Sequence, residues 1–134
     1  MAKAITRRTG FGLFLRYWLP VTAYVSLIFF LSAQPYLQPP LHFQNSDKLM
    51  HFGEYGLLGL LLGRALHASL TGHDLVFASL LALAIGMAIA ALDERFQAFI
   101  PGRDCSLFDW FADSTGGTFA QLVFLAFARE WRDG

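Results

Sequence analysis

Charge and cysteine are scarce in this sequence. Only 15% of the 134 residues are charged, and ten basic residues balance ten acidic ones. Soluble domains carry about 25% charged residues, so this composition argues against a soluble domain. A zero net charge without a basic, aromatic stripe gives no basis for nucleic-acid binding. The single cysteine, Cys105, has no internal disulfide partner. We expect it to be a small, half-buried residue and not a reactive thiol.

Long apolar runs take the place of charge. Hydrophobic residues make up 55% of the chain, and the mean hydropathy is +0.46. The runs are about twenty residues long, which is the length that an α-helix needs to cross the ~30 Å hydrocarbon core of a bilayer. We therefore predict an all-α integral membrane bundle of four transmembrane helices, formed by a single domain, 1–134. The predicted spans are roughly 14–33, 47–67, 74–99 and 107–128.

Short signals predict where these helices begin and end. Pro35, Pro39 and Pro40 would end the first helix and make an extended loop. Ser106, with Asp109 three residues later, predicts a capping box at the start of the last helix. The basic start of the chain is also typical of a signal peptide, but the apolar run that follows is long, which favours an uncleaved first helix.

The placement of lysine and arginine predicts an orientation. Cytoplasmic loops carry an excess of these residues, and an N-in, C-in topology places seven of them inside and three outside. The inner set is Lys3, Arg7, Arg8, Arg16, Arg64, Arg129 and Arg132, and the outer set is Lys48, Arg95 and Arg103. With this topology, segments 47–55, 93–103 and 109–117 share the outer face, where we expect a polar cluster.

The first of these segments offers three polar side chains. Lys48, His51 and Tyr55 share one face of a helix, so they can point together into the bundle. An interface belt is the alternative, because Lys extends its ammonium group to the membrane surface and Tyr anchors at the headgroups.

The second segment directly follows an apolar run, 80–92, that contains no charged residue. Asp93 and Gln97 lie one helical turn apart, and Glu94 follows Asp93. Two acids at a helix C-terminus oppose the helix dipole, which indicates that another group holds them there. Asp93 and Glu94 would belong either to a functional site or to a structural network in which they pair with Arg103, His51 or Lys48. Arg103 can also donate two hydrogen bonds to a carboxylate, a phosphate or a phospholipid headgroup.

The third segment carries Asp109 and Asp113, one helical turn apart. Asp109 is favourable at a helix N-terminus, so it is either a cap or a site residue. Asp113 lies deeper and is expected to face the interior. Ala112, Gly116 and Ala120 form a face of small residues that predicts close packing against another helix.

The three segments together resemble the VanZ-like family of membrane proteins. Residues 46–55, SDKLMHFGEY, resemble that family's sDKxxHfxxY segment, and residues 93–103, DERFQAFIPGR, resemble its DExxQxfxpxR segment. Asp109, Asp113 and Gly117 are similar to its following D…D…G helix. Glu54 stands where the family often has an apolar residue. The resemblance implies a multi-pass protein of the bacterial cytoplasmic (inner) membrane, and the family's namesake is associated with low-level resistance to the glycopeptide teicoplanin.

Three hypotheses for function stay open. In the first, the outer-face site binds an anionic lipid headgroup, a lipid-linked cell-wall precursor or a glycopeptide-related ligand, and Lys48, Arg103 and Arg95 supply positive charge. The candidate binding residues are Lys48, Tyr55, Gln97, Arg103, Asp109 and Asp113. In the last of the three hypotheses, the chain is a small scaffold for envelope proteins and the polar cluster is purely structural.

The second hypothesis is a membrane-embedded hydrolase or transferase. Asp93 or Glu94 would act as general base and His51 as acid or proton shuttle. No cofactor is predicted, but a metal-assisted version would hold a divalent ion among Asp93, Glu94, His51, Asp109 and Asp113. Oxygen ligands suit Mg²⁺ or Ca²⁺, and the histidine favours Mn²⁺ or Zn²⁺. The sequence has no standard catalytic motif to decide the reaction class.

Overall fold

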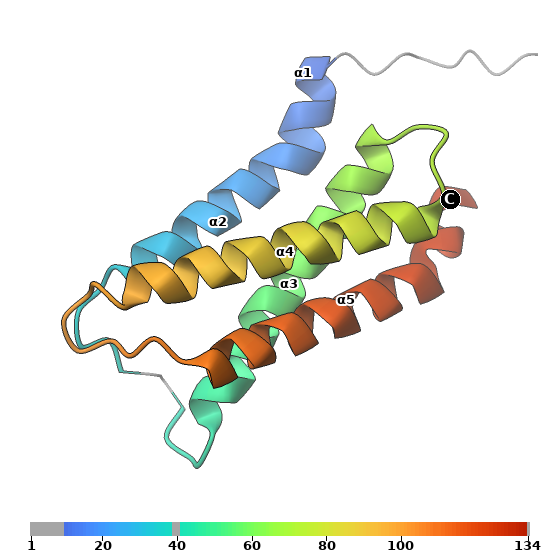
Figure 1. Ribbon diagram of the computed structural model, residues 1–134. Coiled ribbons are helices and arrows are strands. Elements are labelled where there is room, and N and C mark those ends of the chain that lie inside the picture. Colours follow the sequence, from blue (N-terminus) through green and yellow to red (C-terminus); the bar gives the residue numbers. More distant parts are fainter. Residues whose placement is uncertain (1–9, 39–40, 134) are drawn as a thin grey trace, which may run out of the picture.

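The computed structural model describes residues 10–38 and 41–133, and within these ranges the chain is helical and contains no strand (Figure 1). Three short elements join end to end into one helical stretch, and three long helices follow. The elements are α1 (Gly10–Leu13), the π-helix η1 (Phe14–Trp18), α2 (Leu19–Ser32), α3 (Ser46–Ser69), α4 (Leu75–Gln97) and α5 (Leu107–Asp133). The all-α prediction is confirmed, and each predicted span corresponds to one helical stretch.

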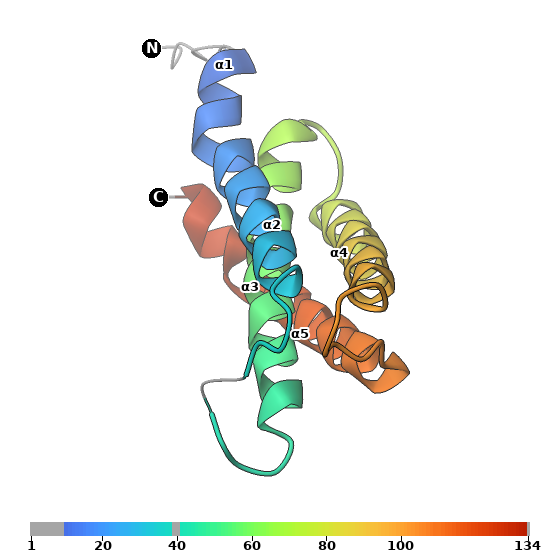
Figure 2. The same ribbon diagram turned by 90° about the vertical axis from the view of Figure 1, so that its left-hand side faces the viewer.

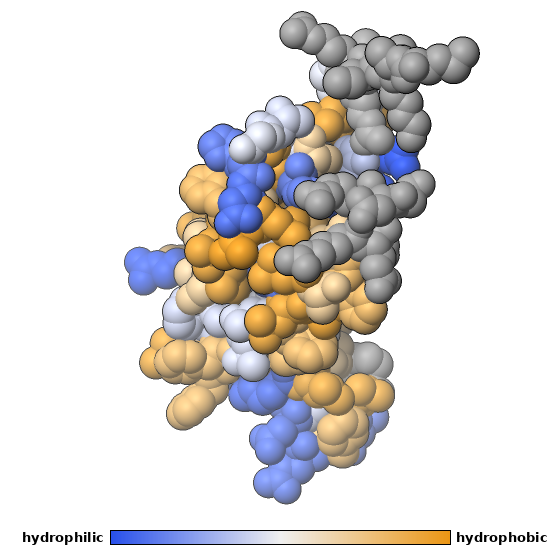
Figure 3. Space-filling model, turned by 90° about the vertical axis from the view of Figure 1, so that its right-hand side faces the viewer, coloured by the Kyte–Doolittle hydropathy of each residue, from blue (hydrophilic) through white to orange (hydrophobic). Residues whose placement is uncertain are grey.

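Two of the helical stretches are long and apolar enough to cross a membrane, Gly10–Ser32 and Leu75–Gln97. Helices α3 and α5 are as long but carry more polar residues. Large apolar side chains such as Phe30, Leu80 and Leu122 are exposed on the helix surfaces. Figure 3 shows hydrophobic residues over much of one face, with hydrophilic residues at its lower end. Four complete crossings and their orientation stay predictions.

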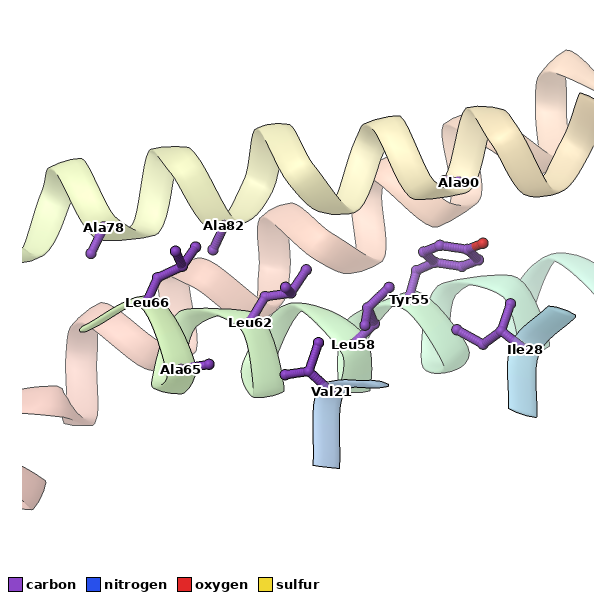
Figure 4. Packing of buried hydrophobic residues seen from close by; sticks show 10 residues of the cluster. All are labelled: Val21, Ile28, Tyr55, Leu58, Leu62, Ala65, Leu66, Ala78, Ala82 and Ala90. Atoms are coloured by element: carbon purple, nitrogen blue, oxygen red, sulfur yellow. The ribbon is translucent and has the colours of Figure 1, made fainter. Parts of the chain in front are cut away.

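Helix α3 lies at the centre of the bundle. It contacts α2, α4 and α5, and its contact with α5 is the most extensive (Figures 1 and 2). Leucines of α3, including Leu58 and Leu62, pack against small residues of α4, including Ala82 and Ala90 (Figure 4). Val21 joins them from α2. Small residues on α4 let its backbone approach α3 closely, as is usual for helices packed in membranes.

The contact between α3 and α5 depends on glycine. A Cβ atom at Gly116 would overlap the carbonyl oxygen of Phe52 in α3. On the other side, a Cβ at Gly59 would lie 2.9 Å from Cβ of Ala120. The Nε2 atom of Gln121 donates to the carbonyl of Gly59 at 2.7 Å. The predicted close-packing face of the last helix is therefore confirmed at Gly116 and Ala120.

The π-helix η1 lies just before Pro20, the second residue of α2. Proline has no amide hydrogen, so it cannot donate to the carbonyl four residues earlier, which belongs to Arg16. Nη1 of Arg64 on α3 donates to that carbonyl at 3.3 Å. The carbonyl that Pro20 leaves without a helical donor is therefore hydrogen-bonded by a side chain of the central helix. Proline is a usual cause of such helix distortions.

Two local predictions are wrong. In a capping box, the Asp109 carboxylate would accept the Ser106 amide, but that amide donates to Oε2 of Glu94 at 3.0 Å. Asp109 pairs with Lys48 instead, because the start of α5 lies against both α3 and the end of α4. Cys105 is exposed, not half-buried, since it lies in the connection before α5.

Some predictions concern parts of the chain outside the described residues. Lys3, Arg7, Arg8, Pro39 and Pro40 fall there. The side chains of Arg129 and Arg132 also lie outside what the structure describes, although their backbone belongs to α5. The described part of the predicted loop after the first helix includes Pro35, which follows the end of α2 at Ser32.

Candidate functional site

Three polar segments that are distant in sequence meet at one end of the bundle, here called the polar end. Helices α3 and α5 begin there, and α2 and α4 end there (Figure 1). Side chains from α3 bond to acids of both α4 and α5 at this end. The predicted clustering of the three segments is therefore what the structure contains.

Lys48, at the start of α3, has its charge shared between two carboxylates. Its Nζ lies 2.6 Å from Oδ2 of Asp47 and also pairs with Oδ1 of Asp109 on α5. Asp47 is half exposed, whereas the Asp109 side chain is largely buried. Lys48 therefore ties α3 to α5 and has little charge left for a bound anion.

His51 lies one turn further along α3, within a group of acids. Its Nδ1 lies 2.8 Å from Oδ1 of Asp113. When Asp113 is ionised its carboxylate only accepts hydrogen bonds, and Nδ1 is then the donor. Nε2 of His51 lies 3.8 Å from Oδ2 of Asp109, and Nδ1 lies 3.9 Å from Oε1 of Glu94. His51 thus faces acids of both α4 and α5.

Tyr55 belongs to a second, deeper network. Its hydroxyl donates to Oδ2 of Asp93 at 3.1 Å, and Nε2 of Gln97 donates to the same oxygen at 3.2 Å. Gln97 also donates to the hydroxyl of Ser32 at 3.3 Å. Asp93 is 1% exposed. This network joins α2, α3 and α4, and it separates Asp93 from the acids around His51.

Arg103 does not pair with an acid in the described part of the chain. Its Nε donates to the carbonyl of Gln34 at 3.1 Å and its Nη2 to the carbonyl of Leu31 at 2.7 Å. These carbonyls lie at the end of α2, where a cation favours the helix dipole. Of the partners considered for Arg103, a carboxylate is therefore not the one that the structure contains, because the turn before α5 brings Arg103 to α2. Arg95 is exposed and lines a separate hollow beside Trp110.

A cavity of about 360 Å³ opens at the polar end, between α2, the loop after it, and the ends of α3 and α4. Its polar lining comes from Arg103, His51, Gln97 and Glu54, among others. The full lining is Leu31, Ser32, Leu37, Gln38, Asp47, Met50, His51, Glu54, Gln97 and Arg103. Glu54 had no predicted role. Only its position one turn after Met50 could have indicated that it shares a face with the cavity wall.

Several carboxylate oxygens at the polar end are buried without a hydrogen-bond partner among the described residues. They are Oδ1 of Asp93, Oε1 of Glu94 and Oδ2 of Asp113. A buried acceptor without a partner costs about 1–3 kcal/mol, and more when it is charged. One atom from each of His51, Glu94 and Asp109 lies within 4.8 Å of the others, a spacing that could hold a metal ion. Asp93 is not part of this group.

The model of one protein family, described as VanZ/LLP1, matches residues 13–128. The match takes in every residue of the polar end described above. None of the curated proteins and none of the solved structures matches the chain.

Proposed function

Because this chain belongs to the VanZ/LLP1 family and has a polar cavity at one end of an apolar bundle, we propose that it is a cell-envelope membrane protein that binds an anionic lipid headgroup. The ligand is a membrane phospholipid or a lipid-linked cell-wall precursor. The observation that carries the proposal is the cavity beside Arg103.

The lining of the cavity suits an amphiphile. Arg103, His51 and Gln97 provide hydrogen-bonding groups on one part of the wall, while Leu31 and Met50 provide apolar surface on another. A volume of about 360 Å³ falls within the range of small-ligand pockets, about 300–1,000 Å³. A headgroup can therefore occupy the cavity while the acyl or prenyl chain stays on the apolar surface of the bundle.

Arg103 is the cation best suited to the anion. Two of its five N–H donors are bonded to carbonyls, which fixes the guanidinium group without neutralising it. Among the described residues, no acid lies within ion-pairing distance of Arg103, whereas Lys48 already pairs with Asp47 and Asp109. Guanidinium groups bind phosphate through two parallel hydrogen bonds, so Arg103 is the predicted phosphate partner.

Binding of the purified full chain to vesicles of phosphatidylglycerol, phosphatidylcholine, or phosphatidylcholine with undecaprenyl phosphate tests the proposal. Charge-assisted hydrogen bonds contribute about 1.5–3 kcal/mol, so Arg103→Gln should weaken binding of the anionic lipid about 10–100-fold. Arg95→Gln is the matched control, because Arg95 is exposed outside the cavity, and it should bind like the wild type.

Equal binding by wild type and Arg103→Gln would refute the proposal. If Arg103→Gln does not fold, Met50→Trp serves instead, because it fills the cavity without touching the caps on α2. Preference for undecaprenyl phosphate over phosphatidylglycerol would identify the wall precursor as the source of the headgroup. Raised teicoplanin resistance on expression of the wild type, but not of Arg103→Gln, would extend the family association to this chain.

A membrane-embedded hydrolase or transferase is the second candidate function. It is favoured by the bond between His51 and Asp113, which orients the imidazole as acids do in general-base catalysis. If the protein is such an enzyme, Glu94→Gln should no longer convert the bound lipid to product, while it binds that lipid as tightly as the wild type does. Loss of folding in both Glu94→Gln and Arg103→Gln would favour a purely structural cluster.

A further inference from the structure

The strongest feature beside the headgroup cavity is the group formed by His51, Glu94 and Asp109, which shares His51 with the cavity wall. These side chains come from three different helices, α3, α4 and α5, and one atom of each lies within 4.8 Å of the others. Each of the three is also held by a partner at its other polar atom.

The imidazole of His51 is oriented with one nitrogen left over. Nδ1 bonds to Oδ1 of Asp113, which is 1% exposed. If Nδ1 carries the hydrogen, Nε2 of the neutral ring has a lone pair, and it lies 3.8 Å from Oδ2 of Asp109. A histidine that binds a metal ion through one ring nitrogen usually donates the N–H of its other ring nitrogen to a carboxylate, a carbonyl or water.

In Glu94 and in Asp109, likewise, one carboxylate oxygen is bonded to a neighbouring group and the other oxygen is left for a ligand. Oε2 of Glu94 accepts the Ser106 amide at 3.0 Å, while its Oε1 is buried without a hydrogen-bond partner in the described chain. Glu94 is 4% exposed. Oδ1 of Asp109 pairs with Lys48, which leaves Oδ2 on the side of His51. Each side chain is therefore fixed by a neighbour and keeps a remaining atom near the others: Oδ2 of Asp109 lies 3.8 Å from Nε2 of His51, and Oε1 of Glu94 lies 3.9 Å from Nδ1 of the same ring.

The charge at this point is also unbalanced. Glu94, Asp109 and Asp113 are all buried, and among the described residues the only groups within 4.0 Å of these three acids that can carry positive charge are Lys48 and His51, one fewer than the acids. Buried charges are normally paired or bound to a metal ion. Removing the partner of a buried charge is strongly unfavourable, so a group with this much negative charge calls for a further cation.

We propose that His51, Glu94 and Asp109 bind one divalent transition-metal ion. A ligand set of one imidazole nitrogen and two carboxylate oxygens suits Zn²⁺ or Mn²⁺ better than Mg²⁺ or Ca²⁺. Two ligands of one ion lie at most twice a bond length of about 2.0–2.2 Å apart, which is about 4.0–4.4 Å, and they lie closer in a tetrahedral site. The side chains must therefore close by up to about 1 Å or slightly more, which changes of side-chain rotamer supply. The ion binds whether or not a lipid fills the cavity.

Metal titration of the full chain in dodecyl maltoside, after removal of metal with EDTA, tests this proposal. The wild type should bind one Zn²⁺ or Mn²⁺ per chain, measured by calorimetry and elemental analysis, and the ion should raise its thermal unfolding midpoint. Glu94→Gln and His51→Gln should weaken binding by tenfold or more. Asp113→Asn should weaken it about 10–100-fold, as expected when a residue that orients a ligand is lost.

Asp104→Asn is the matched control, because Asp104 is an exposed acid in the connection before α5 and is not one of the three ligands. It should bind the ion like the wild type. The proposal is overturned if the wild type binds no ion, or if Glu94→Gln binds it as tightly as the wild type. It is also overturned if Mg²⁺ and Ca²⁺ bind equally well and His51→Gln leaves them unchanged, because the acids then only attract cations.

Two measurements on the wild type keep the test decisive where a variant does not fold. Co²⁺ in place of the ion should give the visible absorption of a site with a nitrogen ligand, and EDTA should lower the unfolding midpoint reversibly. Absence of both effects would refute the site. Vesicle binding of Arg103→Gln reports on the headgroup cavity alone, so failure of either proposal is distinguishable from failure of the other.

Discussion

Replacing Gly116 with alanine tests whether the α3–α5 contact builds the polar end. The new Cβ would overlap the carbonyl oxygen of Phe52 and lie 2.9 Å from its carbonyl carbon. Both are backbone atoms, so no side chain can move aside. Overpacking costs about 1–3 kcal/mol, and alanine recovers about 0.5–1 kcal/mol of helix propensity. We therefore expect Gly116→Ala to lower the free energy of unfolding by about 1–2 kcal/mol.

The same substitution should disturb the site. His51 directly precedes Phe52, and Asp113 lies one turn before Gly116, so the two ends of the 2.8 Å hydrogen bond sit beside the clash. Relief of the overlap needs a separation on the order of 1 Å, since non-bonded atoms prefer about 3.5 Å. That shift takes the His51–Asp113 bond beyond hydrogen-bonding distance. Divalent-ion affinity should therefore fall together with stability.

Thermal unfolding in detergent and metal titration measure the two effects. Gly53→Ala is the matched control, because Gly53 lies on the same helix as Phe52 and a Cβ there would meet nothing within 4 Å. It should raise the free energy of unfolding by about 0.5–1 kcal/mol and leave ion binding unchanged. The reasoning fails if Gly116→Ala is as stable as Gly53→Ala and binds the ion like the wild type.

Two further predictions concern the deeper network and the topology. Tyr55→Phe leaves the buried Asp93 carboxylate with Gln97 as its remaining hydrogen-bond donor, so the unfolding free energy should fall by about 1–3 kcal/mol, and an unchanged midpoint would contradict this. A reporter fused after residue 134 should be active in the cytoplasm, as N-in, C-in topology requires, and activity in the periplasm would reverse the assigned faces.

The four helical stretches of the described residues could be predicted because apolar runs, together with the turn residues between them, indicate roughly where each one lies. The predicted first span, 14–33, begins within the helical stretch that ends at Ser32, and the predicted last span, 107–128, begins at the first residue of α5. The π-turn before Pro20 could not be predicted in the same way. Pro20 leaves the carbonyl of Arg16 without its helical donor, but the group that bonds this carbonyl is Arg64 of another helix, and no local pattern indicates which side chain will lie there.

The polar end was only half predictable, and the reason is geometric. Helical periodicity correctly placed Lys48, His51 and Tyr55 on one face, since that requires only the position of each residue on its own helix. Each of them contacts a different acid. Which acid meets which residue depends on the rotation and depth of the other helices. That is why a carboxylate stayed among the expected partners of Arg103, whereas Arg103 contacts carbonyls at the end of α2.

The two cations of the polar end differ in a way that lets an acidic cluster and an anion site lie side by side. Lys48 is paired with acids, whereas Arg103 is held by neutral carbonyls and keeps its full charge. His51 lines the cavity and also faces Glu94, so the two sites share a wall. A divalent ion beside His51 would reduce the repulsion between the acids and an anionic headgroup. Ion and headgroup should therefore strengthen each other's binding, and linkage makes that effect reciprocal.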